Sequence, residues 1–92
     1  MSPAIAKVGK KNCRILIYPT IQILVSYTTQ VAILVEKDNV IFITKTKYSN
    51  TTSRHISGFL RHCRNTDIEY VPQEILDKII QKEVGALKNV YA

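Results

Sequence analysis

The chain has 92 residues and a formal net charge of +6, with 46% hydrophobic and 22% charged residues. This length fits one small domain with a modest core, and this composition excludes long-range disorder. Residues 1–66 hold ten basic and two acidic side chains, whereas residues 67–92 hold three basic and five acidic ones. This excess of basic residues suits an anionic partner such as nucleic acid, a nucleotide, an acidic protein or a membrane surface. The alternative explanation is that the charge serves only to keep the protein soluble.

The first residues and the two cysteines bear on domain organisation and location. Residues 1–12 combine three lysines with one proline and one glycine, which predicts a flexible basic arm before a single domain at 13–92. The chain shows neither a signal peptide nor a continuous apolar span, so we expect no membrane association. Cys13 and Cys63 are expected to be reduced thiols. Together these features predict a cytoplasmic protein.

Residues 13–46 have the pattern of β-strands. A β-rich run at 13–18 stops at a proline, which is typical of an edge strand. Apolar and mixed positions then alternate over 21–28, and a nearly continuous apolar run follows at 31–35. A turn at residues 36–39 leads into a returning strand. The last two residues of the turn, Asp38 and Asn39, both tolerate positive φ and fit a tight hairpin.

Two helices are expected after these strands. Thr51, Thr52 or Ser53 can cap the first one, because each hydroxyl can accept a free N–H of the first turn. Its apolar stripe, at helical spacing, is Ile56, Phe59, Leu60 and Cys63. A short extended piece at 67–71 precedes Pro72, which starts the second helix, and Gly85 is expected to end it. This order predicts an α+β fold: a small antiparallel sheet of three or four strands with two helices packed on one face.

The segment 45–64 is the strongest candidate for a functional surface, because it is basic and contains no acidic residue. Arg54 and Arg61 are two helical turns apart, about 10 Å, which roughly matches the spacing of nucleic-acid phosphates one or two nucleotides apart. The alternative is an ordinary solvated helix face. The residues expected to bind nucleic acid or another anion are Lys45, Lys47, Tyr48, Thr51, Thr52, Ser53, Arg54, His55, Arg61 and Arg64.

Hydroxyl groups and His55 occupy the start of the first helix, and His62 lies two turns further along. The free N–H groups of a helix N-terminus can bind a phosphate or carboxylate, and ordinary capping is the alternative. His55 and His62 are too far apart for one metal ion, and no carboxylate or thiol lies at ligand spacing, so we expect no metal site. His55 is expected to hydrogen-bond a neighbouring strand or to shape a pocket, and His62 to be exposed.

No pair of acidic residues has the sequence context of acid–base catalysis, which argues against an enzyme.

Two blocks of this chain resemble a group of small phage-associated proteins of uncharacterised function. The first block is Ser26–Ala32, with the pattern Ser-Tyr-x-Thr-x-Val-Ala, and the second is Tyr48–Ile56, with the pattern Tyr-Ser-x-Thr-Thr-Ser-x-His. The resemblance covers roughly residues 24–60. It implies a viral or prophage origin, and therefore the host cytoplasm as the location. It also implies one site formed by Tyr27, Thr29, Tyr48, Thr51, Thr52, Ser53 and His55.

Three functions remain open at this point. The first is a non-enzymatic protein without a cofactor that binds RNA or single-stranded DNA, with cationic side chains on phosphates and Tyr48 as a stacking surface. The second is a phage-encoded protein that inhibits a host protein, such as an acidic defence factor. The third is a homo-oligomer that sequesters a small nucleotide at residues 51–55.

Overall fold

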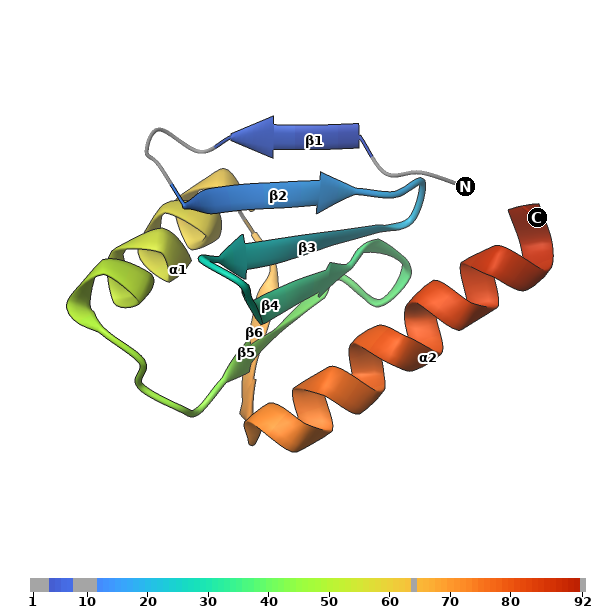
Figure 1. Cartoon of the computed structure of the whole chain (residues 1–92). Helices are drawn as coiled ribbons and strands as arrows, with labels where there is room; N and C mark the ends of the chain where they lie inside the picture. Colours follow the sequence, from blue (N-terminus) through green and yellow to red (C-terminus); the bar gives the residue numbers. More distant parts are fainter. Residues whose placement is uncertain (1–3, 8–11, 64, 92) are drawn as a thin grey trace.

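The computed structural model describes the backbone of residues 4–7, 12–63 and 65–91 and the side chains of residues 12–63 and 65–87. Within these ranges, one six-stranded sheet is flanked by two helices (Figure 1). The strands are β1 (Ala4–Lys7), β2 (Cys13–Ile17), β3 (Ile21–Ser26), β4 (Thr29–Val35), β5 (Val40–Thr44) and β6 (Asp67–Val71). The helices are α1 (Asn50–His62) and α2 (Gln73–Tyr91), and a 3-10 turn, η1 (Glu36–Asp38), precedes β5.

The sheet is mixed, and its strand order follows the sequence. Strands β1 to β5 pair antiparallel with their neighbours, whereas β6 pairs parallel with β5. Parallel neighbours need a long crossover connection, and the segment that contains α1 provides it. The α+β class is therefore confirmed, but the prediction of a purely antiparallel sheet with three or four strands is wrong.

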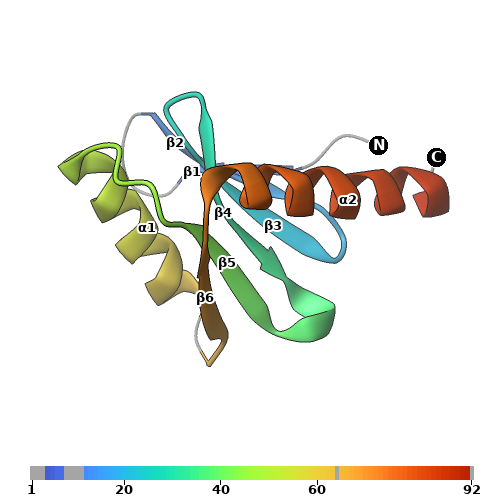
Figure 2. The ribbon, with the colours of Figure 1, turned by 90° about the horizontal axis from the view of Figure 1, so that it is seen from below.

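The two helices cover opposite faces of the sheet (Figure 2), so the prediction that both pack on one face is wrong. The core on the α1 face consists of Cys13, Ile15, Leu24, Val31, Ala32, Leu34, Ile41, Ile43 and Phe59. The core on the α2 face consists of Ile21, Ile23, Val25, Ile33, Val35, Val71, Leu76, Ile80 and Leu87. Successive side chains of β3 and β4 enter both cores, which explains why these strands are apolar at consecutive positions.

Residues with positive φ make two of the connections. Tyr27, at φ 56°, lies in the two-residue turn between β3 and β4. Asn39, at φ 50°, ends η1 and leads into β5, as expected for the hairpin predicted there. The register between β3 and β4 shifts beside Val31, which therefore shares the α1 face with Ala32.

Both ends of the chain differ from expectation. Ala4–Lys7 pairs with β2, so this part of the predicted flexible arm is a strand, and residues 1–3 and 8–11 lie outside the described residues. Helix α2 continues through Gly85 to Tyr91, so Gly85 is not its end. Neither α1 nor α2, over the residues described, is long and apolar enough to cross a membrane.

Candidate functional site

Ser49 caps the N-terminus of α1. Its backbone is extended, at φ −164°, and its hydroxyl accepts the backbone N–H of Thr52 at 3.0 Å. The prediction that Thr51, Thr52 or Ser53 caps the helix is wrong, because all three lie inside the first turn. A hydroxyl three residues before the N–H that it accepts is the usual capping geometry, and Ser49 is the residue that meets it.

Ser26, at the end of β3, joins α1 through a buried polar cluster. Its Oγ atom lies 2.9 Å from Thr52 Oγ1 and 2.8 Å from His55 Nδ1. Ser49 Oγ in turn donates to Thr52 Oγ1 at 3.2 Å. We call Ser26, Ser49, Thr52 and His55 the Ser26 cluster. The bond from His55 to a neighbouring strand, expected from the sequence, is confirmed, and His62 is exposed as expected.

The Ser26 cluster joins β3 to α1, and three of its members have almost no exposed surface. Ser26 is 1% exposed, Thr52 4% and His55 6%. Tyr27 lies in the adjoining turn, and the centroid of its ring is 6.1 Å from that of the His55 ring. Two residues predicted to contact an anion, Thr52 and His55, therefore bind Ser26 in the interior instead of facing the solvent.

The residues named by the resemblance lie close together in space. A surface hollow of about 370 Å³ is lined by Ser26, Tyr27, Thr29, Tyr48, Ser49, Thr51 and Thr52. His55 lies beneath it, bonded to Ser26. Ser53 faces a different depression, on the other flank of α1. The turn between β3 and β4 and the first turn of α1 therefore lie next to each other and line the same hollow.

Tyr48 is held beside the start of α2. Its hydroxyl donates to Gln73 Oε1 at 2.9 Å, and the amide nitrogen of Gln73 donates to the backbone carbonyl of Gln30 at 2.9 Å. The ring is 45% exposed. Tyr48 therefore links the loop before α1 to α2 and β4, and it does not lie beside the outer face of α1.

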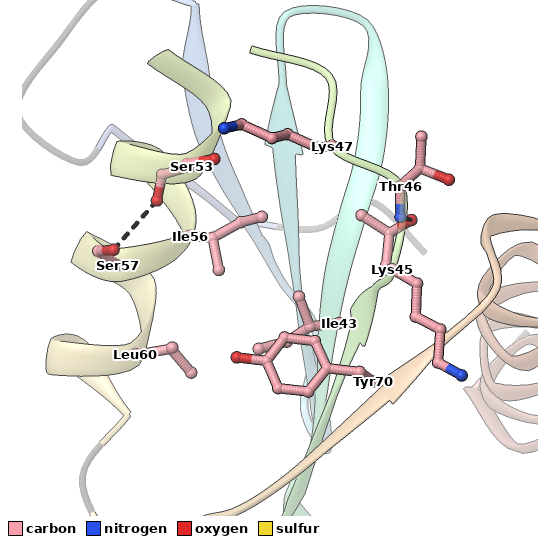
Figure 3. Close-up of a pocket in the computed structure, with 10 residues that line it drawn as sticks. Ile43, Lys45, Thr46, Lys47, Ser53, Ile56, Ser57, Leu60 and Tyr70 are labelled. Carbon is pink, nitrogen blue, oxygen red and sulfur yellow. Dashed lines mark hydrogen bonds between the residues drawn. The ribbon is translucent and has the colours of Figure 1, made fainter. Parts of the chain in front are cut away.

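A second depression, of about 480 Å³, lies between α1 and the strands β5 and β6 (Figure 3). We call it the α1–β6 groove. Its apolar lining comes from Ile43, Ile56, Leu60 and Tyr70. Its polar lining is Thr44, Lys45, Thr46, Lys47, Ser53 and Ser57. Among the described residues that line the groove, none is acidic.

Two of the predicted cations line this groove, and two others lie on the neighbouring outer face of α1. Lys45 and Lys47 follow β5 and are exposed. Arg54 and Arg61 are also exposed, and the helical period places them on the outer face of α1 next to Ser57, which lines the groove. Helix α1 contains no acidic residue that could neutralise them. Arg64 lies outside the described residues.

Tyr70 was not among the residues predicted to form a site. Its ring is 55% exposed and lines the groove, because parallel pairing places Tyr70 beside Ile43 on the α1 face. Residues 67–71 were expected to be extended, but the pattern alone did not say which strand they would join. The available signal was the alternation of Ile68 and Tyr70 with acidic residues, which is typical of a strand with one apolar face.

The two cysteines are the remaining groups with reactive side chains among the described residues considered for a site. Burial raises the pKa of the Cys13 thiol. Burial, assisted by the negative charge of Glu36, raises the pKa of Cys63 to about 11, so this thiol is protonated and weakly nucleophilic at neutral pH. Among the described residues, no three His, Cys, Asp or Glu side chains come together as a metal site would require.

Comparison with known protein families finds a match over most of the chain. The model of a family described as a family of unknown function (DUF8033) matches residues 5–78, which include the sheet, α1 and the start of α2. No curated protein and no solved structure matches the chain.

Proposed function

The chain belongs to a family of unknown function (DUF8033), and we propose from the site itself that it binds single-stranded RNA or DNA at the α1–β6 groove. The observation that carries this proposal is a groove without acidic lining residues that is lined by Lys45 and Lys47, with Arg54 and Arg61 exposed on the adjoining outer face of α1. Lys45 and Lys47 come from the end of β5, and Arg54 and Arg61 come from α1.

The charge arrangement suits a phosphate backbone. Phosphates are bound by lysine as a point charge and by arginine through paired N–H donors. Arg54 and Arg61 lie two turns apart on one helix face, so they can meet phosphates that follow each other along a strand. No acidic residue of β6 or α2 lines the groove, although Lys45 also lines a neighbouring depression together with Glu74 and Asp77 of α2.

The lining favours single strands over a duplex. A duplex hides its base faces and offers a protein mainly phosphates, sugars and base edges. The floor of the α1–β6 groove is apolar and aromatic, through Ile43, Ile56, Leu60 and Tyr70. Such a surface is complementary to the face of an unpaired base, which is how single strands are bound without sequence preference.

A charge-removal experiment tests this proposal. We expect Arg54→Ala with Arg61→Ala to weaken the binding of a labelled single-stranded oligonucleotide about tenfold, measured by fluorescence anisotropy at low salt. The slope of log K against log salt should become shallower by about 0.7 for each phosphate that the variant no longer neutralises.

The matched control removes the same charge elsewhere. Lys78 and Lys82 are exposed on α2, beyond the opposite face of the sheet, so Lys78→Ala with Lys82→Ala should leave the affinity nearly unchanged. Equal decreases in affinity in both double variants would show that only net charge matters and would refute a specific interface. Salt-independent copurification of one host protein, without nucleic acid, would support the protein-inhibitor alternative instead.

A further inference from the structure

We propose that the α1–β6 groove is a subsite for one unpaired base, with Tyr70 as its stacking platform and with Lys45 and Lys47 at the flanking phosphates. This inference rests on the proposed function and specifies it further, because it assigns a base-binding role to a residue outside the basic patch. It also moves the expected stacking surface from Tyr48 to Tyr70.

The position of Tyr70 in the sheet keeps its ring available. Strand β6 is at the edge, and its alternation sends Tyr70 to the α1 face and Val71 to the core under α2. Between α1 and β6 the groove remains open, so the ring is 55% exposed (Figure 3). By the same alternation, the carboxylate of Glu69 belongs to the α2 face and does not oppose a phosphate in the groove.

The opposite wall can enclose a flat ligand. Ile56 and Leu60 project from α1 toward the groove, and the hydroxyl end of Tyr70 points toward Leu60 (Figure 3). A base stacked on the face of the Tyr70 ring would have the aliphatic carbons of Ile56 and Leu60 beside its edge. The volume of about 480 Å³ falls within the range of about 300–1,000 Å³ that is typical of small-ligand pockets.

Two hydroxyl groups on α1 add hydrogen-bond acceptors. Ser53 Oγ donates to the carbonyl of Ser49 at 3.1 Å, and Ser57 Oγ donates to the carbonyl of Ser53 at 3.1 Å. Each hydroxyl proton is thereby used within the helix, and each oxygen keeps lone pairs for a donor in the groove. Ring and exocyclic N–H groups of nucleobases are such donors, whereas a carboxylate side chain has none.

The two lysines extend to different sides of the groove. Lys47 reaches toward Ser53 of α1, whereas Lys45 extends away from α1 (Figure 3). A strand that crosses the groove would therefore meet one ammonium group on each side of the bound base. This arrangement distinguishes a nucleic-acid strand from a compact anion, which would need both cations at one point.

The test compares strands with and without bases. With the full chain, we expect a labelled oligothymidylate of about 12 nucleotides, a length within the site sizes of single-strand-binding folds, to bind about tenfold more tightly than an abasic strand of equal length. Tyr70→Ala should remove this difference, and Tyr70→Phe should retain it. The matched control is Ile68→Ala, which shortens an exposed side chain on the same strand outside the groove lining.

The outcomes separate the two proposals. Equal binding of the base-bearing and abasic strands, with the weaker binding of Arg54→Ala plus Arg61→Ala preserved, would overturn the base subsite and leave the proposed function standing. Absence of binding to any strand at low salt would overturn both. Polyglutamate bound as tightly as oligothymidylate would show a response to charge alone and would also overturn the subsite. An oligouridylate with its own abasic control shows whether the subsite accepts RNA.

Discussion

Ser26 connects two parts of the chain that are distant in sequence. Its hydroxyl is the meeting point of Thr52 and His55, which are 26 and 29 residues further along. Because Ser26 is buried, bulk solvent cannot replace its hydroxyl when that group is removed. The position of α1 against β3, and with it one wall of the α1–β6 groove, depends on this small group.

We expect Ser26→Ala to lower the free energy of unfolding by about 1–3 kcal/mol, because Thr52 Oγ1 and His55 Nδ1 lose this partner in the interior. Urea denaturation followed by circular dichroism measures the change. Ser57→Ala is the control, since that hydroxyl is exposed and bonds only within its own helix, and it should change stability by less than about 0.5 kcal/mol. Equal effects of the two substitutions would contradict this role of the Ser26 cluster.

At the scale of the element, α2 shows why a glycine does not always end a helix. Gly85 was expected to be a stop, but Leu87 lies beyond it and is buried in the same core as Leu76 and Ile80. Burial of an apolar side chain in the last turns is worth more than the cost of one glycine in the helix interior, about 1 kcal/mol. Tertiary packing therefore extends the helix past a locally unfavourable residue.

Gly85→Ala is accordingly expected to stabilise the protein by about 0.5–1 kcal/mol. A Cβ atom at this position would meet nothing within 4 Å, so the gain in helix propensity is not offset by a clash. Thermal unfolding should show a higher midpoint than in the wild type. A lower midpoint would mean that the backbone at residue 85 needs a conformation that alanine does not favour.

At the scale of the whole molecule, two cores share one sheet. Phe59 belongs to the core under α1 and Leu76 to the core under α2, and both are fully buried. Strands β3 and β4 supply side chains to both cores. Neither core can therefore be disrupted without exposing apolar surface in the other, which predicts cooperative unfolding.

We expect Phe59→Ala to lower the free energy of unfolding by about 3–5 kcal/mol and Leu76→Ala by about 2–5 kcal/mol. Each variant should still unfold in one transition, with the same midpoint by circular dichroism and by tyrosine fluorescence. Ile75→Ala, an exposed neighbour on α2, is the control and should have a much smaller effect. Two separate transitions in either core variant would contradict the shared-sheet interpretation.

Much of the local structure was predictable from the sequence. The strands over residues 13–44, the extended piece at 67–71 and the apolar stripe of the first helix follow from hydrophobic periodicity. The exposure of Arg54 and Arg61 follows from the same period. Strand β1 was missed because its lysine-rich surroundings resemble a tail, and it is defined only by its pairing with β2.

The candidate site was predictable only in part. The exposed cations of the groove were identified, because a run without acidic residues is visible in the sequence. Thr52 and His55 were expected to contact an anion, and a bond to a neighbouring strand was predicted only for His55. That Ser26 is the partner of both could not be predicted, because Ser26 is 26 and 29 residues away from them in the sequence. Tyr70 was overlooked, because its role depends on the strand beside which it pairs.

The α+β class, the apolar stripe of α1 and the basic character of its outer face could be predicted, because each depends on the spacing of side chains along a single element. The placement of the helices on opposite faces, the parallel pairing of β6 with β5 and the position of Tyr70 across a groove from α1 could not. These features arise from contacts between residues far apart in the chain. A strand that is apolar on both faces allows a helix on either one, so the choice is made by the packing of the complete fold.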